Sequence, residues 1–290
     1  MISPAVRGAE AGVPDGMAAF GAYALSPGRE GLRRYAQSLG RSGLARRACS
    51  VIRRIVTAGR AGPFDVEAFP GQMARLYPDQ NLSDKRVFAG VQFWDWVERS
   101  SLGDAVRAAD EPVYFVDAGA NAGLYTLSVR AEAQGKSIRI LAIEPDPENL
   151  ARLQFNLAAS DASEVTVAPV ALSDQAGTAH ITVDHANRGE LSLADKGTQV
   201  TTRPLLDLVV EAGFPRIDAL KIDIEGIEDR VLAHFLDNAP PALLPHLVVI
   251  EAQRGADTPA LARLLAANYV MAKRTKMNAV LCLGPVGTEG

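Results

Sequence analysis

The heptapeptide Asp117-Ala118-Gly119-Ala120-Asn121-Ala122-Gly123 joins a short apolar run at 113–116 to a helical stretch at about 122–134. Gly119 allows a tight turn and lets the backbone approach a ligand closely, and Gly123 allows the helix to pack on the strand. Such a strand-to-helix turn is typical of nucleotide-binding sites. The alternative is an ordinary turn in which Asp117 caps the helix.

Strand-like and helix-like segments alternate after this turn. The expected strands of the main sheet are 113–116, 138–143, 165–170, 217–224 and 247–250, followed by an antiparallel pair at 269–273 and 279–283. Two further runs with alternating polarity, 180–183 and 198–202, are expected to form an inserted β-hairpin. The alternation predicts an α/β fold with a doubly wound, mostly parallel sheet. In such folds ligands bind beyond the carboxyl ends of the strands.

Glu144 ends the second expected strand and stands 21 residues after Gly123. A carboxylate at this place can accept both hydroxyls of a ribose. The glycine spacing is G-x-x-x-G, whereas a dinucleotide-binding turn reads G-x-G-x-x-G so that a pyrophosphate can touch backbone amides. Asn121 would crowd a pyrophosphate, and Asp117 would repel one but suits a cation. S-adenosylmethionine carries an ammonium and a sulfonium and no phosphate, so these residues favour it over NAD.

A second group of charges stands in Leu220-Lys221-Ile222-Asp223-Ile224-Glu225-Gly226. In a strand, Lys221, Asp223 and Glu225 share one face. Charges on one face of a buried strand are costly unless they pair or serve a site. We expect Asp223 and Glu225 to border the cofactor; the alternative is a structural Lys221–Asp223 ion pair with Glu225 in the first turn of the following helix.

Taken in order, these motifs resemble those of the FkbM-type S-adenosylmethionine-dependent methyltransferases. The matching segments are 116–123, Glu144-Pro145-Asp146-Pro147, Ala171-Leu172-Ser173-Asp174, Leu206-Asp207 and 221–226. The resemblance covers roughly 74–250 and departs from the family at Ala118, where isoleucine or valine is usual, and in a longer gap before Leu206-Asp207. It implies a class I methyltransferase fold with a seven-stranded sheet, and methylation of a hydroxyl on a sugar, glycan or natural product.

The resemblance also implies a role for each motif residue. The methionine part of the cofactor would be surrounded by Asp117, Gly119, Asn121 and Gly123. Glu144 would hold the ribose, the adenine would lie near Ala171 and Leu172, and the transferred methyl group would face Asp223 and Glu225.

Methyl transfer requires alignment of the acceptor oxygen and loss of its proton. Asp223 is the first candidate for this base or for positioning the substrate, and Lys221 is the second. Asp223, Glu225 and Glu251 also offer oxygen ligands suited to magnesium. Contacts to cofactor and substrate explain these acids equally well, so no metal is predicted.

The charge of the chain is unevenly distributed. Its 290 residues include 30 Lys+Arg and 34 Asp+Glu, a formal charge of −4, which argues against a nucleic-acid coat. The segment 29–60 nonetheless has nine arginines and one acid, so its net charge is +8 and the rest of the chain has a net charge of −12. A helical wheel over 44–57 separates the arginines from an apolar face formed by Leu44, Ala48, Val51, Ile52 and Ile55. This helix either caps the main domain with its arginines in solvent, or contacts an anionic membrane or a partner.

Three parts of the chain differ in composition. We expect a disordered tail over 1–28, a basic helical extension over 29–102 that covers the main domain, and a methyltransferase domain over 103–290. Two cysteines, no zinc-like Cys/His cluster and no long apolar run favour a cytoplasmic protein without disulfides or membrane spans. Two other functions stay open: a dinucleotide-dependent oxidoreductase, and a membrane-surface or partner-binding protein that acts through 29–60.

Overall fold

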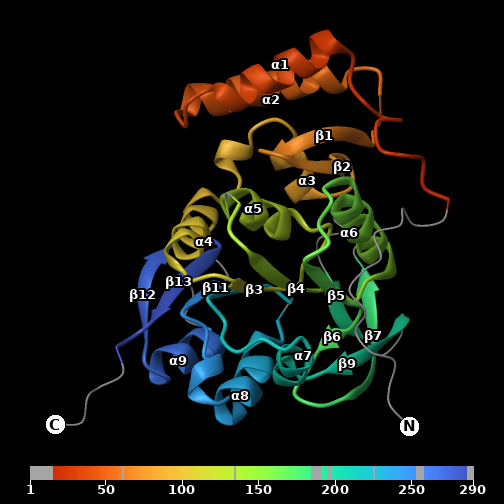
Figure 1. The fold of residues 1–290 in the computed structure, drawn as a ribbon. Helices are drawn as coiled ribbons and strands as arrows, with labels where there is room; N and C mark the ends of the chain where they lie inside the picture. Colours follow the sequence, from red (N-terminus) through yellow and green to blue (C-terminus); the bar gives the residue numbers. More distant parts are fainter. Residues whose placement is uncertain are drawn as a thin grey trace.

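A seven-stranded sheet forms the centre of the computed structural model (Figure 1). The structure describes residues 16–285 except 61, 134, 184–190, 195–196, 225 and 253–257. Across the sheet the strands are β12 (Tyr269–Arg274), β13 (Asn278–Leu283), β11 (Leu247–Glu251), β10 (Ala219–Ile222), β3 (Val113–Ala118), β4 (Ile138–Ile143) and β5 (Val165–Ala168). Neighbours pair in parallel except at β13, which is antiparallel to β11 and β12. The predicted doubly wound, mostly parallel sheet is confirmed.

Helices cover both faces of this sheet (Figure 1). One face carries α4 (Trp96–Ala108), α5 (Leu124–Ala133) and α6 (Pro147–Ala159); the other carries α7 (Leu205–Glu211), α8 (Glu228–Asn238) and α9 (Pro259–Ala266), and a short 3-10 helix, η2 (Pro241–Leu243), precedes β11. Phe115 of β3 enters the first core, whereas its neighbours Tyr114 and Val116 enter the second. Because both faces are buried, the strands are apolar along their whole length. Among the described residues, no helix combines the length and apolar character needed to cross a bilayer.

A smaller sheet is inserted between β5 and β10. It contains β6 (Ala171–Leu172), β7 (Gly177–Val183), β8 (Leu191–Ala194) and β9 (Thr198–Arg203), in the order β6-β9-β7-β8. The antiparallel pairing of β7 with β9 confirms the expected insertion. Two strands were not expected: β8 pairs with the other edge of β7, and β6 runs parallel to β9.

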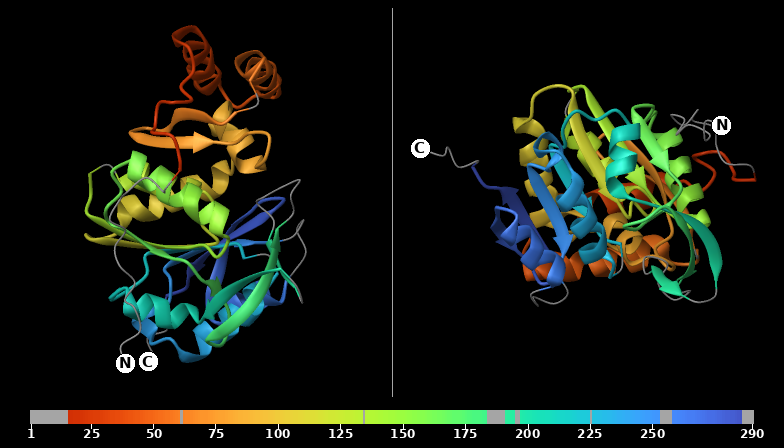
Figure 2. Two further views of the ribbon diagram at one scale, coloured as in Figure 1. Left: turned by 90° about the vertical axis from the view of Figure 1, so that its right-hand side faces the viewer. Right: turned by 90° about the horizontal axis from the view of Figure 1, so that it is seen from below.

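The N-terminal extension lies over the face covered by α4–α6 (Figures 1 and 2). It contains α1 (Pro27–Ser38), α2 (Gly43–Thr57), the hairpin β1 (Phe64–Phe69) and β2 (Gln72–Leu76), α3 (Leu82–Phe88) and a 3-10 turn, η1 (Val91–Phe93). The backbone N–H of Arg75 in β2 donates to Asn156 Oδ1 of α6 at 2.7 Å. Phe64 and Phe88 belong to the same core as Leu153 of α6. The extension and the sheet are therefore joined by one continuous core.

Part of the segment expected as a tail lies against this hairpin. The backbone N–H groups of Gly21 and Tyr23 donate to Asp65 Oδ2 at 2.8 and 3.0 Å. Asp65 is buried and pairs with Arg75 at 2.7 Å, and Arg75 also donates to the carbonyl of Ala18 at 2.8 Å. This buried ion pair holds residues 18–23 on the molecule, while residues 1–15 lie outside the described part.

The helix expected over 44–57 forms as α2, but the wheel grouped its apolar side chains wrongly. The buried residues are Cys49, Ile52 and Val56. Leu44 and Val51, together with Ile55, are exposed. Of the predicted apolar face, only Ile52 is fully buried, because the helix is rotated toward the side that carries Cys49 and Val56.

Candidate active site

A cavity of about 250 Å³ opens at the carboxyl ends of the parallel strands. It lies beside the neighbouring strands β3 and β10, where the strand order reverses, the usual ligand position in doubly wound sheets. Its wall includes Asn81, Arg86, Trp94, Asp95, Gly119, Asn121, Leu124, Tyr125, Glu144, Ala171, Leu172, Lys221, Asp223 and Glu251. The predicted cofactor edge and the predicted catalytic edge thus meet in one cavity.

The two glycines of the turn have different structural reasons. Gly119 has φ +78°, and a Cβ there would stand 1.9 Å from the backbone oxygen of Asp223. Gly123 has φ +85°, and a Cβ there would stand 2.6 Å from Leu153 Cδ1 on α6. Gly119 therefore brings the ends of β3 and β10 together at the cavity, and Gly123 allows α6 to pack against the turn.

Glu144 is the acid that the cavity buries most completely. Its side chain accepts two backbone hydrogen bonds, from Asn121 to Oε2 at 2.7 Å and from Asp146 to Oε1 at 3.0 Å. Burial raises the pKa of Glu144 to about 7, against the lowering effect of these two N–H donors. Each carboxylate oxygen retains a lone pair for a further donor. The carboxylate is thus fixed at the cavity wall with capacity for two hydroxyls.

Lys221 lies between two carboxylates at the end of β10. Its Nζ donates to the Gly119 carbonyl at 2.8 Å and stands 3.7 Å from Asp223 Oδ2 and 3.9 Å from Asp117 Oδ1. The Lys221–Asp223 pair that the sequence left open as an alternative is therefore present, and both residues line the cavity. Nζ thus joins the end of β10 to the glycine turn and faces two acids. We therefore expect Lys221 to position these loops, and Asp223 to be the better base candidate.

Asp117 lies beneath the glycine turn and is fully buried. Its Oδ2 accepts hydrogen bonds from the backbone N–H and the hydroxyl of Thr126, at 3.0 and 2.7 Å. Its Oδ1 has no hydrogen-bond partner among the described residues. Burial raises the pKa of Asp117, partly offset by Lys221. Asp117 thus ties β3 to α5, and its contact with the cofactor stays a prediction.

The other predicted residues have clear positions. Asn121 has φ 51° and accepts a hydrogen bond at Oδ1 from Asn81 Nδ2 at 3.0 Å. Ala171 and Leu172 line the cavity on β6, and their contact with the adenine stays a prediction. Glu225 lies outside the described residues, and its predicted role is untested.

The sequence interpretation missed two wall residues from the extension, Asn81 and Asp95, and one from α5, Tyr125. The Tyr125 hydroxyl donates to Asp95 Oδ2 at 2.9 Å. Burial raises the pKa of Asp95, with Glu98 adding to the shift, and burial raises the pKa of Tyr125 well above its usual value. Asp95 also has a left-handed backbone, φ 39°. A non-glycine residue at positive φ is typical of a functional position. The sequence did not reveal it, because the run around Trp94 and Trp96 has only a helix-like pattern.

Three carboxylates approach one another at the cavity edge. Oxygens of Asp223, Glu228 and Glu251 lie within 4.8 Å of one another. Glu228 accepts hydrogen bonds from the backbone N–H groups of Ile224 and Gly226, at 2.9 and 3.0 Å. These bonds explain Glu228 as the group that shapes the loop after β10. Asp223 and Glu251 remain oriented toward the cavity as its acidic rim.

The strand order, with β13 antiparallel beside β11, and the glycine turn at the switch point define a class I methyltransferase fold. The family model described as "Methyltransferase FkbM domain" matches residues 117–271, more than half of the chain. This chain belongs to the FkbM methyltransferase family.

Two of the proteins to which this chain is similar carry the same family name. The 31-O-demethyl-FK506 methyltransferase FkbM of Streptomyces tacrolimicus is 30% identical over a 176-residue alignment. The match covers 49% of this chain and 66% of that protein, slightly under two thirds. Methyltransferase FkbM from Methylobacillus flagellatus KT is 17% identical, with a TM-score of 0.41 over 86% of this chain and 57% of that chain. Precorrin-6y C5,15-methyltransferase from Geobacter metallireducens GS-15 is 15% identical, with a TM-score of 0.40 over 63% of this chain and 84% of that chain.

Proposed function

We propose that this methyltransferase uses S-adenosylmethionine as methyl donor and transfers the methyl group to a hydroxyl oxygen. The observation that carries the first part is the acidic cavity. Four carboxylates line it, from Asp95, Glu144, Asp223 and Glu251, against two cationic groups, Arg86 and Lys221. A wall with an excess of acids attracts a sulfonium and an ammonium and repels a pyrophosphate.

The residues present fit this cofactor in a second way. Glu144 is held by two backbone donors and keeps a lone pair on each oxygen, as a ribose with two hydroxyls requires. Gly119 and Asn121 line the same cavity beside Glu144. We infer that Glu144 holds the ribose, that Gly119 and Asn121 border the methionine part, and that Ala171 and Leu172 border the adenine.

The proposed acceptor is a hydroxyl of a sugar, glycan or natural product. The name of the Streptomyces tacrolimicus relative gives it an O-demethyl substrate, which supports oxygen as the acceptor atom here. Two cavity carboxylates are suited to face that hydroxyl. Asp223 lies at the end of β10, and Asp95 comes from the extension, which makes the extension part of the acceptor site.

The catalytic task of the protein is to align the acceptor and take its proton. When bound, the cofactor supplies an electrophilic methyl group on its sulfonium. Asp223 can accept the proton of the hydroxyl, and Lys221 at 3.7 Å stabilises its negative charge. Asp95 can also accept this proton. The Tyr125 hydroxyl holds its carboxylate in place, and its raised pKa makes that carboxylate a stronger base. Trp94 and Leu124 add apolar surface to this wall.

A dinucleotide-dependent oxidoreductase, the other enzyme class that the sequence left open, fits this protein less well. Membership of the FkbM methyltransferase family supports methyl transfer, and the acid excess of the cavity is unfavourable for two phosphates.

An extract of the host cell, depleted of this protein, can test the function. The extract is incubated with S-adenosylmethionine and either the native protein or the Glu144→Ala variant, and small molecules and glycans are compared by mass spectrometry. We expect a product heavier by one CH2 only with the native protein, with the added methyl on oxygen. A methyl group on nitrogen or carbon would overturn oxygen transfer, and equal products with both proteins would overturn the site.

A further inference from the structure

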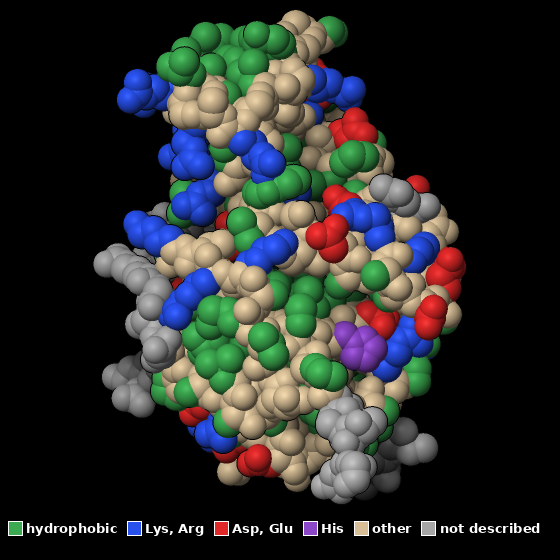
Figure 3. All heavy atoms as spheres, turned by 90° about the vertical axis from the view of Figure 1, so that its left-hand side faces the viewer, with side chains coloured by type: hydrophobic (Ala, Val, Ile, Leu, Met, Phe, Trp, Pro, Cys, Tyr) green, Lys and Arg blue, Asp and Glu red, His purple; other side chains and the backbone are tan. Residues whose placement is uncertain are grey.

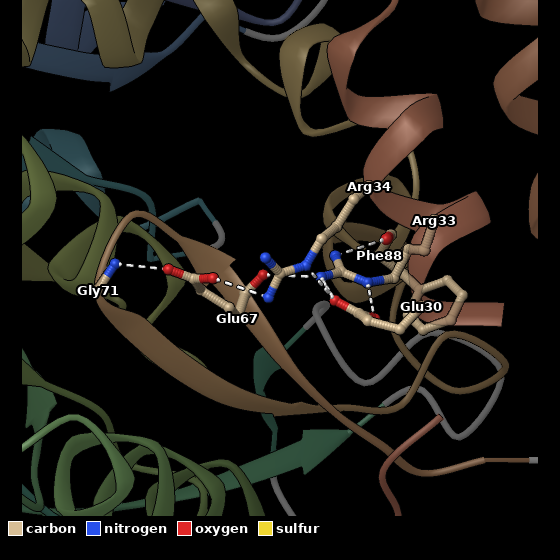
Figure 4. Close-up of polar contacts among 6 residues, drawn as sticks. All are labelled: Glu30, Arg33, Arg34, Glu67, Gly71 and Phe88. Atoms are coloured by element: carbon tan, nitrogen blue, oxygen red, sulfur yellow. Dashed lines mark hydrogen bonds and ion pairs between the residues drawn. The ribbon is translucent and has the colours of Figure 1, made fainter. Parts of the chain in front are cut away.

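The helical hairpin α1–α2 forms an outer layer above β1 and β2. Figure 2 shows the two helices end-on, side by side over the β-hairpin. Arg33 of α1 is 1% exposed; it pairs with Glu30 and donates to the carbonyls of Glu67 and Phe88 at 3.1 and 3.3 Å (Figure 4). Arg34 adds an ion pair to Glu67. These contacts fix the hairpin on the molecule, so it presents one constant face outward.

Further contacts fix α2 and its connection to α1. Gln92 Nε2 donates to the carbonyls of Ala36 and Leu39 at 2.9 and 3.1 Å. The Arg41 guanidinium, between the helices, stacks 3.7 Å over the Trp96 ring at the start of α4. The buried side of α2 is thereby set, and its opposite side is directed away from the body.

The outer side of α2 carries an exposed aliphatic stripe. Leu44, Val51 and Ile55 are 77%, 55% and 53% exposed. Their spacing of seven and four residues places them along one face of the helix. Figure 3 shows apolar side chains gathered over this end of the molecule, with Lys and Arg side chains around them. Contiguous exposed aliphatic side chains on a rigid surface indicate a contact site.

Two arginines adjoin this stripe. Arg47 precedes Val51 by four residues and Arg54 follows it by three, so both are neighbours of Val51 on the helix surface. Both are exposed. Within the described part of the chain, neither guanidinium has an ion-pair or hydrogen-bond partner. Arg33 and Arg34, in contrast, are used internally, so Arg47 and Arg54 are the cations available to an external anion.

We propose that the outer face of α2 docks on an anionic phospholipid surface. Aliphatic side chains beside arginines on one face of a helix match a bilayer interface, where acyl chains lie next to phosphate groups. Arg47 and Arg54 stand beside the aliphatic stripe on α2 and supply the positive charge that would face the lipid phosphates. A second copy of this chain fits this face less well, since it would bring two +8 segments together.

Vesicle sedimentation tests the proposal with the full chain. Vesicles of phosphatidylcholine containing about 30% phosphatidylglycerol are compared with pure phosphatidylcholine vesicles. We expect binding to the anionic vesicles, little binding to the neutral ones, and release at roughly 0.5 M NaCl. Arg47→Gln with Arg54→Gln should weaken binding about five-fold per arginine. Val51→Ser with Ile55→Ser should weaken it about ten-fold or more.

Matched controls separate docking from misfolding. Val210→Ser with Val270→Ser removes two equally exposed valines, 60% and 58% exposed, outside the hairpin, and should leave vesicle binding unchanged. All variants should keep the native melting temperature, because each substituted side chain is exposed. The proposal would be overturned by equal binding to neutral vesicles or by no binding to anionic vesicles. It would also be overturned if the protein formed a dimer that the Val51→Ser, Ile55→Ser variant dissociates.

Discussion

Replacing Glu144 by glutamine tests the proposed ribose contact, and the pH dependence of binding gives the test a magnitude. In the free protein, burial raises the pKa of Glu144 to about 7. Two ribose hydroxyls that donate to the carboxylate favour its ionised form, so bound ligand lowers this pKa. Below pH 7 the free protein must therefore lose a proton on binding, and affinity falls as the pH falls. Between pH 8 and pH 6 the Kd should rise about ten-fold.

The substitution itself should cost more at high pH. Hydrogen bonds to a charged acceptor contribute about 1.5–3 kcal/mol each. Glutamine retains one acceptor, and its NH2 faces the N–H of Asn121 or Asp146, so one backbone donor loses its partner. We expect a loss of about 3 kcal/mol, or roughly a hundred-fold in Kd, at pH 8. The loss should shrink to about ten-fold at pH 6, where native Glu144 is already mostly protonated.

Isothermal titration with S-adenosylhomocysteine, the demethylated product, measures this without turnover. The control is Glu132→Gln. Glu132 is a half-buried residue at the end of α5 that pairs with Arg107, and the variant should keep both the native affinity and its pH dependence. A native Kd that is the same at pH 6 and pH 8, or a Glu144→Gln variant with native affinity, would refute the assignment of Glu144 to the ribose.

Three further predictions concern the surrounding residues. Gly119→Ala should lower the melting temperature strongly, because its Cβ would meet the Asp223 carbonyl. The control Gly135→Ala, at φ +87° with open space around it, should lower the stability by only about 1 kcal/mol. Native stability of Gly119→Ala in calorimetry would contradict the close approach. Lys221→Met should lower the free energy of unfolding in urea by about 3–5 kcal/mol at pH 8, because buried Asp117 loses its nearest cation. Adding Asp117→Asn should restore part of that stability, and no recovery in the double variant would count against this pairing. Asp95→Asn should lower kcat with the identified acceptor about a hundred-fold while S-adenosylhomocysteine affinity stays native. Tyr125→Phe should shift the acid limb of the pH–rate profile upward, because it removes the hydrogen bond that favours ionised Asp95; an unchanged kcat in Asp95→Asn would contradict a role of Asp95 at the acceptor.

The strands of the main sheet could be predicted because buried parallel strands are short apolar runs between helices. The position of Gly119 and Glu144 at one edge of the sheet could be predicted for the same reason. Both stand at strand ends, and the order of the elements along the chain determines where those ends lie. Strand β8 was missed because its four residues have too little alternation to separate it from a loop. Asp95 was missed because the contact that reveals it, with Tyr125, joins residues 30 positions apart.

The N-terminal extension shows where pattern reasoning is insufficient. On α2, Ile52 lies next to Leu44 on one side of the wheel and next to Cys49 and Val56 on the other. A wheel cannot tell which of these adjoining apolar groups packs inward. That choice depends on α1 and on the buried contacts of Arg33, which link segments far apart in the chain. The +8 charge could be counted from the sequence, but which arginines face solvent could not.

A crystal structure of the protein with S-adenosylhomocysteine tests the central claim most directly. The account predicts the ligand in the cavity at the ends of β3 and β10, with both ribose hydroxyls on the Glu144 carboxylate and the adenine against Leu172. Ligand density outside this cavity, or a ribose that does not contact Glu144, would contradict it.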